Sequence, residues 1–151
     1  MGQLTMRLTD PGNATVSRTK LFSQLETATA VIYVFDLSSS FSEALIQYEA
    51  TVNSHWLRNS SIIVIFNNLK GFAKRLAEAP LSDGFPDYAG RDDKIGAMNY
   101  ILSRIKPLTQ PDLQFYAHFT NGVYDDGDLL KIWRYIQDGI VDRALKSLLP
   151  R

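Results

Sequence analysis

The sequence lacks cysteine, an excess of charge of either sign, and any long apolar run. With no cysteine among its 151 residues, a disulfide framework and a thiolate metal site are excluded, which fits a reducing, cytoplasmic compartment. Lysine plus arginine and aspartate plus glutamate both number 16, so the balance favours neither nucleic acid nor an acidic substrate as partner. No apolar stretch approaches the roughly 20 residues that cross a bilayer, so we expect no transmembrane segment. The length predicts one domain with a real core.

The apolar residues that are present are concentrated in a short central stretch. Residues 61–68 read SIIVIFNN, and the five residues from Ile62 to Phe66 leave no face for water. This pattern is typical of a parallel strand covered by helices on both faces. Similar runs at residues 31–35 and 113–119 are each followed by polar or glycine residues. Because ligands bind at the carboxyl ends of such strands, the sequence predicts an α/β fold with a site at that edge.

Periodicity and turn residues predict the remaining elements. The expected strands are residues 3–9, 30–37, the apolar run 62–66 within residues 61–68, and 113–119. The expected helices are residues 15–28, 41–55, 71–79, 92–105 and 126–148, with a loop over 79–90. In the helix over 92–105, the predicted buried face comprises Ile95, Met98, Ile101, Leu102 and Ile105. In the last helix it comprises Leu129, Ile132, Trp133, Ile136, Ile140, Val141 and Leu145.

Four segments together resemble one family. Residues 53–56 (NSHW) with 61–63 (SII) resemble the NKW…SIIL stretch, residues 85–90 (FPDYAG) the YPEYAG loop, residues 116–120 (YAHFT) the YTHFT strand, and residues 138–146 the final helix. These are segments of heterotrimeric G protein α subunits. From residue 4 onward the chain is similar to the C-terminal half of their Ras-like domain. The resemblance implies one partial, truncated Ras-like domain over residues 1–151, a three-layer fold with a mainly parallel sheet of about four strands, without the inserted helical domain.

The departures from the family concern phosphate chemistry. The phosphate-binding GxxxxGK[ST] loop, whose amides and lysine hold the phosphates, has no counterpart in these residues. The family's DVGGQ becomes residues 10–14, DPGNA. The resemblance assigns Asp10 a residual role in orienting magnesium, with Gly12 beside it. The glutamine that orients the attacking water is replaced by Ala14, which cannot hydrogen-bond through its side chain. We therefore expect no catalytic residue.

The two guanine loops of the family are also altered. NKxD appears as residues 67–70, NNLK: Asn67 is kept, Asn68 replaces the lysine that covers the base, and Lys70 replaces the aspartate that accepts from guanine. A donor there faces donors, which costs orders of magnitude in discrimination. TCAT appears as Thr120, Asn121, Gly122 and Val123, where the Gly122 amide remains available. The resemblance makes these positions a vestigial nucleotide site, and we expect no cofactor, although the family binds GTP or GDP with Mg²⁺.

Other polar and aromatic residues have structural interpretations. His55 and His118 lie in no nucleophile pattern and are predicted to be structural. Asp125, Asp126 and Asp128 suit the start of a helix rather than a cation site. Trp56 and Trp133 are expected in the core, and Asn67 with Asn68 is also consistent with a plain turn.

Three functions remain open. The favoured hypothesis is a signalling and interaction protein without GTP hydrolysis, which retains faces for βγ subunits, effectors or receptors. The resemblance places βγ and effector contacts on residues 14–28 and receptor contacts on the last helix, at the inner face of the plasma membrane. The alternatives are a piece of a functioning guanine-nucleotide-binding α subunit and a folded remnant without a signalling role.

The missing phosphate-loop strand creates a topological problem. In the Ras-like fold that strand lies between those at residues 3–9 and 30–37. We expect residues 3–9 to pair directly with 30–37, with a homodimer through the edge at residues 31–35 as the alternative, because that edge carries no charge or proline.

Overall fold

The computed structural model describes residues 7–10, 25–39, 41–58, 60–90, 93–122 and 126–148. The elements in order are strand β1 (Ala30–Asp36), helix α2 (Phe41–Val52), a 3₁₀ turn (His55–Leu57), β2 (Ser61–Asn67), α3 (Leu69–Glu78), α4 (Leu81–Gly84), α5 (Lys94–Ile105), a second 3₁₀ turn (Lys106–Leu108), β3 (Phe115–Phe119) and α6 (Asp126–Leu148).

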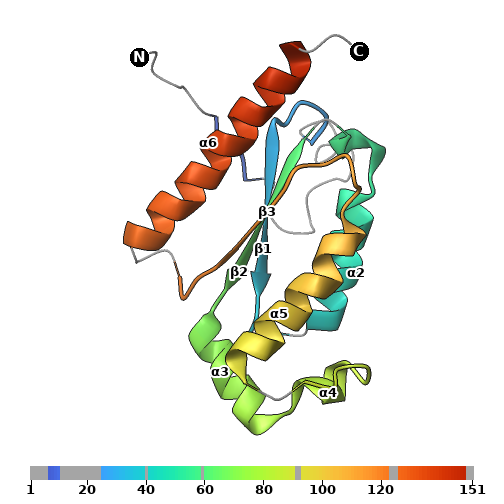
Figure 1. Ribbon diagram of the computed structural model, residues 1–151, viewed down its shortest axis with the longest axis vertical. Helices are drawn as coiled ribbons and strands as arrows, with labels where there is room; N and C mark the ends of the chain where they lie inside the picture. Colours follow the sequence, from blue (N-terminus) through green and yellow to red (C-terminus); the bar gives the residue numbers. More distant parts are fainter. Residues whose placement is uncertain are drawn as a thin grey trace.

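The strands form a parallel sheet in the order β1-β2-β3. The central strand β2 is buried from Ser61 to Phe66, as its uninterrupted apolar run predicts. Ile63 pairs with Ile32 on one side and with Tyr116 on the other. Because all three strands run the same way, their carboxyl ends lie at one edge of the sheet (Figure 1).

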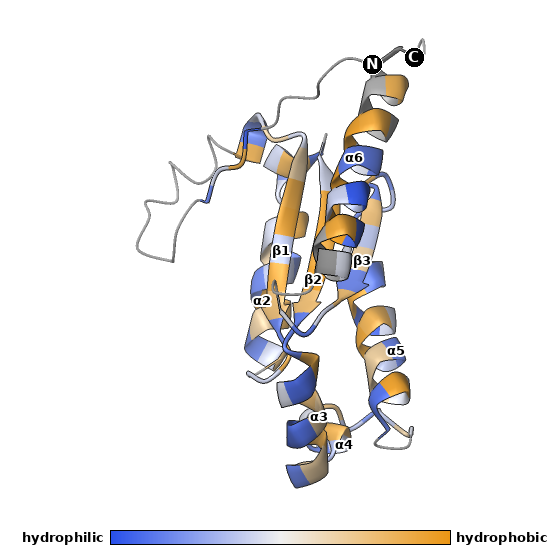
Figure 2. Ribbon diagram, turned by 90° about the vertical axis from the view of Figure 1, so that its left-hand side faces the viewer, coloured by the Kyte–Doolittle hydropathy of each residue, from blue (hydrophilic) through white to orange (hydrophobic). Residues whose placement is uncertain are grey.

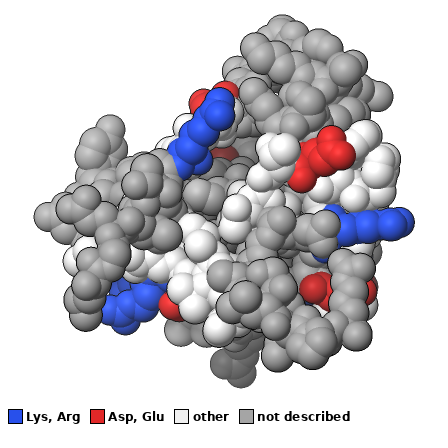
Figure 3. Space-filling model, turned by 90° about the horizontal axis from the view of Figure 1, so that it is seen from above, with Lys and Arg blue, Asp and Glu red and all other residues white. Residues whose placement is uncertain are grey.

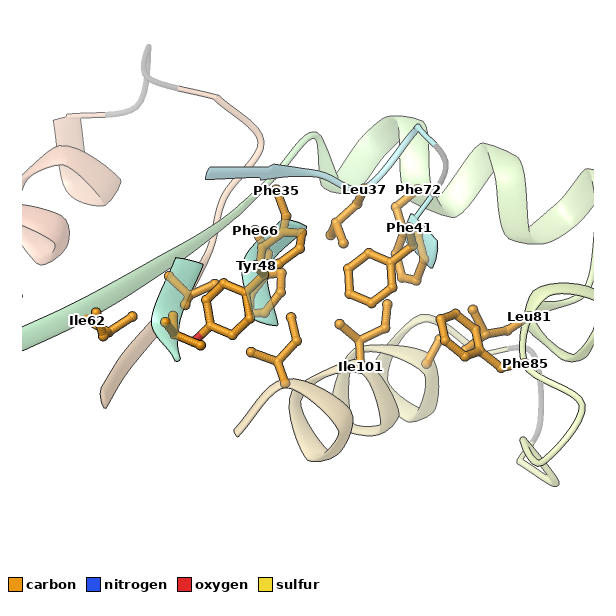
Figure 4. Close-up of a cluster of buried hydrophobic side chains, with 14 of the residues drawn as sticks. Phe35, Leu37, Phe41, Tyr48, Ile62, Phe66, Phe72, Leu81, Phe85 and Ile101 are labelled. Atoms are coloured by element: carbon orange, nitrogen blue, oxygen red, sulfur yellow. The ribbon is translucent and has the colours of Figure 1, made fainter. Parts of the chain in front are cut away.

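Helices lie on both faces of this sheet. Helices α2 and α5 pack on one face and α6 lies across the other (Figures 1 and 2). The main core lies on the α2 and α5 side, where Phe35, Phe41, Tyr48 and Phe66 gather (Figure 4). The phenyl rings of Phe35 and Phe66 stack with their centroids 5.5 Å apart. This three-layer arrangement confirms the predicted truncated Ras-like α/β fold.

The predicted strands and helices are largely confirmed, with two exceptions near the start of the chain. Residues 7–9 are exposed and form no strand, so the expected strand at 3–9 is wrong in its described part, and the described residues give three strands rather than four. The rest of that strand lies outside the described residues. Of the helix expected at 15–28, the described part is helical only at residues 25 and 26.

Several side chains predicted to be buried are exposed. In α5 the buried residues are Ala97, Ile101 and Ile105, whereas Ile95 is 68% exposed. In α6 the residues Trp133, Val141 and Leu145 are 47%, 53% and 57% exposed. The reason is geometric: a helix on an open sheet buries a narrow stripe, and its flanks need further elements to cover them.

The predicted loop at 79–90 contains a short helix. Helix α4 begins after Pro80, and Leu81 anchors it in the core. Beyond it, the Asp87 carboxylate accepts hydrogen bonds from the Tyr100 hydroxyl at 2.8 Å and from Arg104 at 3.1 Å. The loop is thereby fixed to α5.

Charge and hydropathy on the described surface agree with the composition. Side chains of both signs are interspersed among the described atoms of the face in Figure 3. Within the described part of the chain, no helix is long and apolar enough to cross a membrane.

Candidate functional site

The two loops predicted to hold the vestigial site lie side by side at the carboxyl edge of the sheet. The backbone amide of Thr120 donates to the carbonyl of Phe66 at 2.8 Å, and the amide of Leu69 donates to the carbonyl of Thr120 at 3.2 Å. These bonds join residues 67–70 to residues 120–122, as the resemblance predicts.

Asn68 stands at the centre of this edge and is committed to structural contacts. Its backbone is left-handed, with φ of 67°, a conformation that asparagine tolerates better than most residues. Its side-chain oxygen caps helix α3 by accepting from the amide of Gly71 at 3.1 Å. Its Nδ2 donates to the Ser38 hydroxyl at 2.9 Å and to the Asp36 carboxylate at 3.3 Å. The nitrogen and the oxygen of this amide are therefore both engaged within the chain.

Asp36 and Ser38 complete a network that the sequence analysis did not identify. One Asp36 oxygen accepts from the Ser38 hydroxyl at 2.7 Å and from the Ser38 amide at 2.9 Å. These bonds from Ser38, with that from Asn68, hold the pKa of the Asp36 carboxyl below its usual range. The signal available in the sequence was an aspartate at the carboxyl end of a predicted strand. We call Asp36, Ser38 and Asn68 the polar latch.

Arg75 fastens the same loop from α3. Its guanidinium donates to the carbonyl of Ser39 and, at 3.5 Å, to that of Leu37. The loop after β1 is thus tied to both ends of the first two turns of α3. At this part of the sheet edge, the side chains of Asn68 and Arg75 therefore bind the loop after β1.

Asn67 is the exception, because its side-chain oxygen has no partner. Among the described residues, Asn67 Oδ1 is the buried side-chain atom without a hydrogen bond. Such an atom is a potential acceptor for a ligand.

The remaining predicted site residues fall into two groups. Lys70 is exposed in the first turn of α3. In the second loop, the Thr120 hydroxyl accepts from the amide of Gly122 and donates to its carbonyl, both at 3.1 Å. Gly122 has a φ of 130°, which glycine adopts without strain. Asn121 is exposed. Thr120 and Gly122 therefore shape their own loop.

The predicted magnesium position is not joined to this edge by these hydrogen bonds. Asp10 is exposed, and Gly12 lies outside the described residues. No group of three or more metal-ligating His, Cys, Asp or Glu side chains occurs in the described segments. His118 is buried and lies against the ring of Tyr135, as a structural histidine would.

Comparison with known proteins agrees with the strand-edge geometry. The family model for the G-protein alpha subunit matches residues 1–140. The chain belongs to this family. It is 33% identical to the guanine nucleotide-binding protein alpha-2 subunit of Neurospora crassa, and the match covers 99% of this chain and 46% of that protein. It is 29% identical to the alpha-3 subunit of the same organism, and that match covers 97% of this chain and 44% of the subunit. It is 28% identical to the alpha-2 subunit of Saccharomyces cerevisiae, and the match covers 95% of this chain and 34% of that protein. This Gα chain thus spans less than half the length of these relatives.

The residues at the Gα guanine position fit a guanine ring poorly. Guanine presents an amino group, which is a hydrogen-bond donor. Where the family faces this group with an acceptor, this chain has Lys70, which is also a donor. Asn68 has its amide engaged in the polar latch. Asn67 Oδ1 is the favourable feature. These side chains therefore do not fit selective binding of guanine.

Proposed function

We propose that this chain is a Gα-like signalling module that binds protein partners and neither hydrolyses GTP nor binds guanine selectively. The observation that carries the proposal is the polar latch. At the position where the family covers the base with a lysine, Asn68 instead caps α3 and binds the loop after β1. Because the nitrogen and the oxygen of this side chain both bind groups of the chain itself, the side chain is less available to recognise a ligand.

The sequence supports the loss of hydrolysis independently. Ala14 stands where the family has its water-orienting glutamine, and an alanine side chain can neither donate nor accept a hydrogen bond.

The proposed partners follow the family's surfaces. Residues 14–28 would meet βγ subunits and effectors, and α6 would meet receptors, at the cytoplasmic face of the plasma membrane. Exposed Leu130, Val141 and Leu145 on α6 support a protein-binding role for that helix. The contacts described here give no support to the homodimer through residues 31–35, and it forms no part of the proposal.

A binding and turnover assay tests this function. The immobilised 151-residue chain is expected to retain purified βγ dimer while showing no GTP turnover above buffer. Reversing Arg18 and Lys20 to Glu, within residues 14–28, should abolish retention, whereas Glu78→Lys on exposed α3 should not. Turnover by the parent chain would refute the loss of catalysis, and failure to retain βγ would favour the folded remnant.

The second candidate is a piece of a functioning Gα subunit. It is favoured by the coverage, 46% and 44% of the two Neurospora crassa relatives. An antibody against residues 126–148 would detect a native protein about twice the size of this chain if that candidate holds.

A further inference from the structure

The loop after β3 contains an asparagine that is followed by glycine. Asn121 and Gly122 are the only Asn-Gly pair in the sequence. Asn121 is exposed and belongs to neither a helix nor a strand. Gly122 has a φ of 130°, a backbone conformation that residues with a side chain rarely adopt. Because glycine has no Cβ, no side chain of residue 122 stands between its amide nitrogen and the carboxamide of Asn121.

An exposed asparagine with such a neighbour can react within its own chain. The amide nitrogen of the next residue attacks the carboxamide carbon Cγ and closes a cyclic succinimide. The N–Cγ bond forms, the Cγ–Nδ2 bond breaks, and the amide proton leaves with the side-chain amino group as ammonia. Water then opens the ring at either carbonyl, which gives aspartate or isoaspartate. Water is the one co-reactant that these steps need.

The structure restrains the other asparagines that it describes. The Nδ2 of Asn53 donates to two backbone carbonyls, at 3.0 and 3.3 Å. Asn99 lies inside helix α5, where the following amide donates along the helix. Asn68 belongs to the polar latch, and Asn67 ends the buried strand β2. None of these four residues is followed by glycine, so their side chains and neighbours both disfavour the reaction.

The bonds of Thr120 make the loop sensitive to a change at residue 121. The Thr120 hydroxyl accepts from the amide of Gly122 and donates to its carbonyl, both at 3.1 Å. The backbone of Thr120 is fixed separately, since its amide donates to the carbonyl of Phe66 and its carbonyl accepts from the amide of Leu69. Isoaspartate adds a methylene to the backbone between Thr120 and Gly122. The hydroxyl bonds are therefore expected to break, while the backbone bonds of Thr120 remain.

We propose that Asn121 is a deamidation site, at which the Gly122 amide nitrogen displaces the side-chain nitrogen and the residue becomes aspartate or isoaspartate. The product carries a new negative charge at the carboxyl edge of the sheet, and the isoaspartate form also releases Gly122 from Thr120. The inference is independent of the partners proposed above, because it uses groups of this loop alone.

Peptide mapping tests the proposal. The 151-residue chain is incubated at mildly alkaline pH, and conversion of each asparagine is followed by mass spectrometry. We expect conversion at Asn121 to be at least tenfold faster than at Asn99, which is equally classed as exposed but lies in a helix and precedes Tyr100. Isoaspartate methyltransferase should label the converted chain at residue 121.

Matched variants locate the reaction. Asn121→Ser should abolish the more acidic form that appears on anion exchange, whereas Asn99→Ser should leave its rate of appearance unchanged. Both substitutions replace exposed side chains, and thermal unfolding close to that of the parent shows that the variants fold.

Hydrogen exchange tests the effect on the loop. In the isoaspartate form, separated by chromatography, the Gly122 amide should exchange at least tenfold faster than in the parent. The Thr120 amide, which is bonded to Phe66, should exchange at the parent rate.

Three results would overturn the proposal. An unmodified Asn121 in the folded chain would refute the site, and conversion confined to the urea-unfolded chain would show that the bonds from Thr120 to Gly122 protect it. Equal rates at Asn121 and Asn99 would show that neither the glycine nor the loop selects the residue. An unchanged exchange rate at Gly122 in the isoaspartate form would refute its release from Thr120.

Discussion

Replacing Asn68 tests whether this position has become structural. Asn68→Ala removes the α3 cap, worth about 1 kcal/mol, and the bonds to Asp36 and Ser38, worth roughly 0.5–1 kcal/mol net at a partly exposed site. It also places a Cβ-bearing residue without a local hydrogen bond in the left-handed region, at about 1 kcal/mol. The expected loss of unfolding free energy is about 2–3 kcal/mol.

Glycine at the same position separates the two causes. Asn68→Gly loses the same side-chain bonds but has no left-handed penalty, so its expected loss is about 1 kcal/mol smaller than that of alanine. Asn68→Lys restores the residue the family uses and should cost about as much as alanine, because lysine neither caps α3 nor favours a positive φ.

Urea unfolding followed by tryptophan fluorescence measures these values, with Lys70→Ala as the control. Lys70 is exposed in the same turn, and its replacement should change stability by less than about 0.5 kcal/mol. If glycine destabilises as much as alanine, the left-handed backbone is wrong. If alanine and lysine both fall within error of the parent, the polar latch does not stabilise the fold.

Three further predictions concern pH and packing. Hydrogen bonds from Ser38 lower the folded-state pKa of Asp36 below its unfolded value. The contribution of this carboxylate to the free energy of unfolding is therefore complete above about pH 3.9 and is lost as the pH falls through the lower folded-state pKa. Asp36→Asn should flatten that part of an acid-unfolding curve, and an unchanged curve would contradict the assignment. Ile136→Asp should lower the free energy of unfolding by about 2–3 kcal/mol and Trp133→Asp by less than about 1 kcal/mol, because Ile136 is the more buried of the two; equal losses by thermal unfolding would show that the buried face of α6 is misassigned. Tyr48→Phe should lower the free energy of unfolding by about 1–2 kcal/mol, because it deprives the buried hydroxyl of Thr109, 2.6 Å away, of its hydrogen-bond partner. No loss in thermal unfolding would refute that bond.

Local pattern was sufficient for most of the fold. The buried run at residues 62–66 identified the central strand, and the period of residues 126–148 gave the bounds of α6. Pattern could not assign the flanks of α6, because the exposure of Trp133 depends on which elements lie beside the helix. The same limitation left Ile95 on the wrong face of α5.

The candidate site was predictable in position but not in role. The resemblance placed residues 67–70 beside residues 120–122, and the backbone bonds between Phe66, Leu69 and Thr120 confirm it. The structural role of Asn68 depends on Asp36, which lies 32 residues away in sequence and is brought near by strand pairing. Spacing alone carries no signal for such a contact.

Nucleotide binding tests the central claim most directly. The purified chain and the full-length Neurospora crassa alpha-2 subunit are each titrated by calorimetry with a non-hydrolysable GTP analogue and Mg²⁺, and then with the ATP counterpart. We expect binding heat from the relative. From this chain we expect no heat, or equally weak heats for both nucleotides. Micromolar or tighter binding of the GTP analogue by this chain, with preference over the ATP analogue, would contradict it.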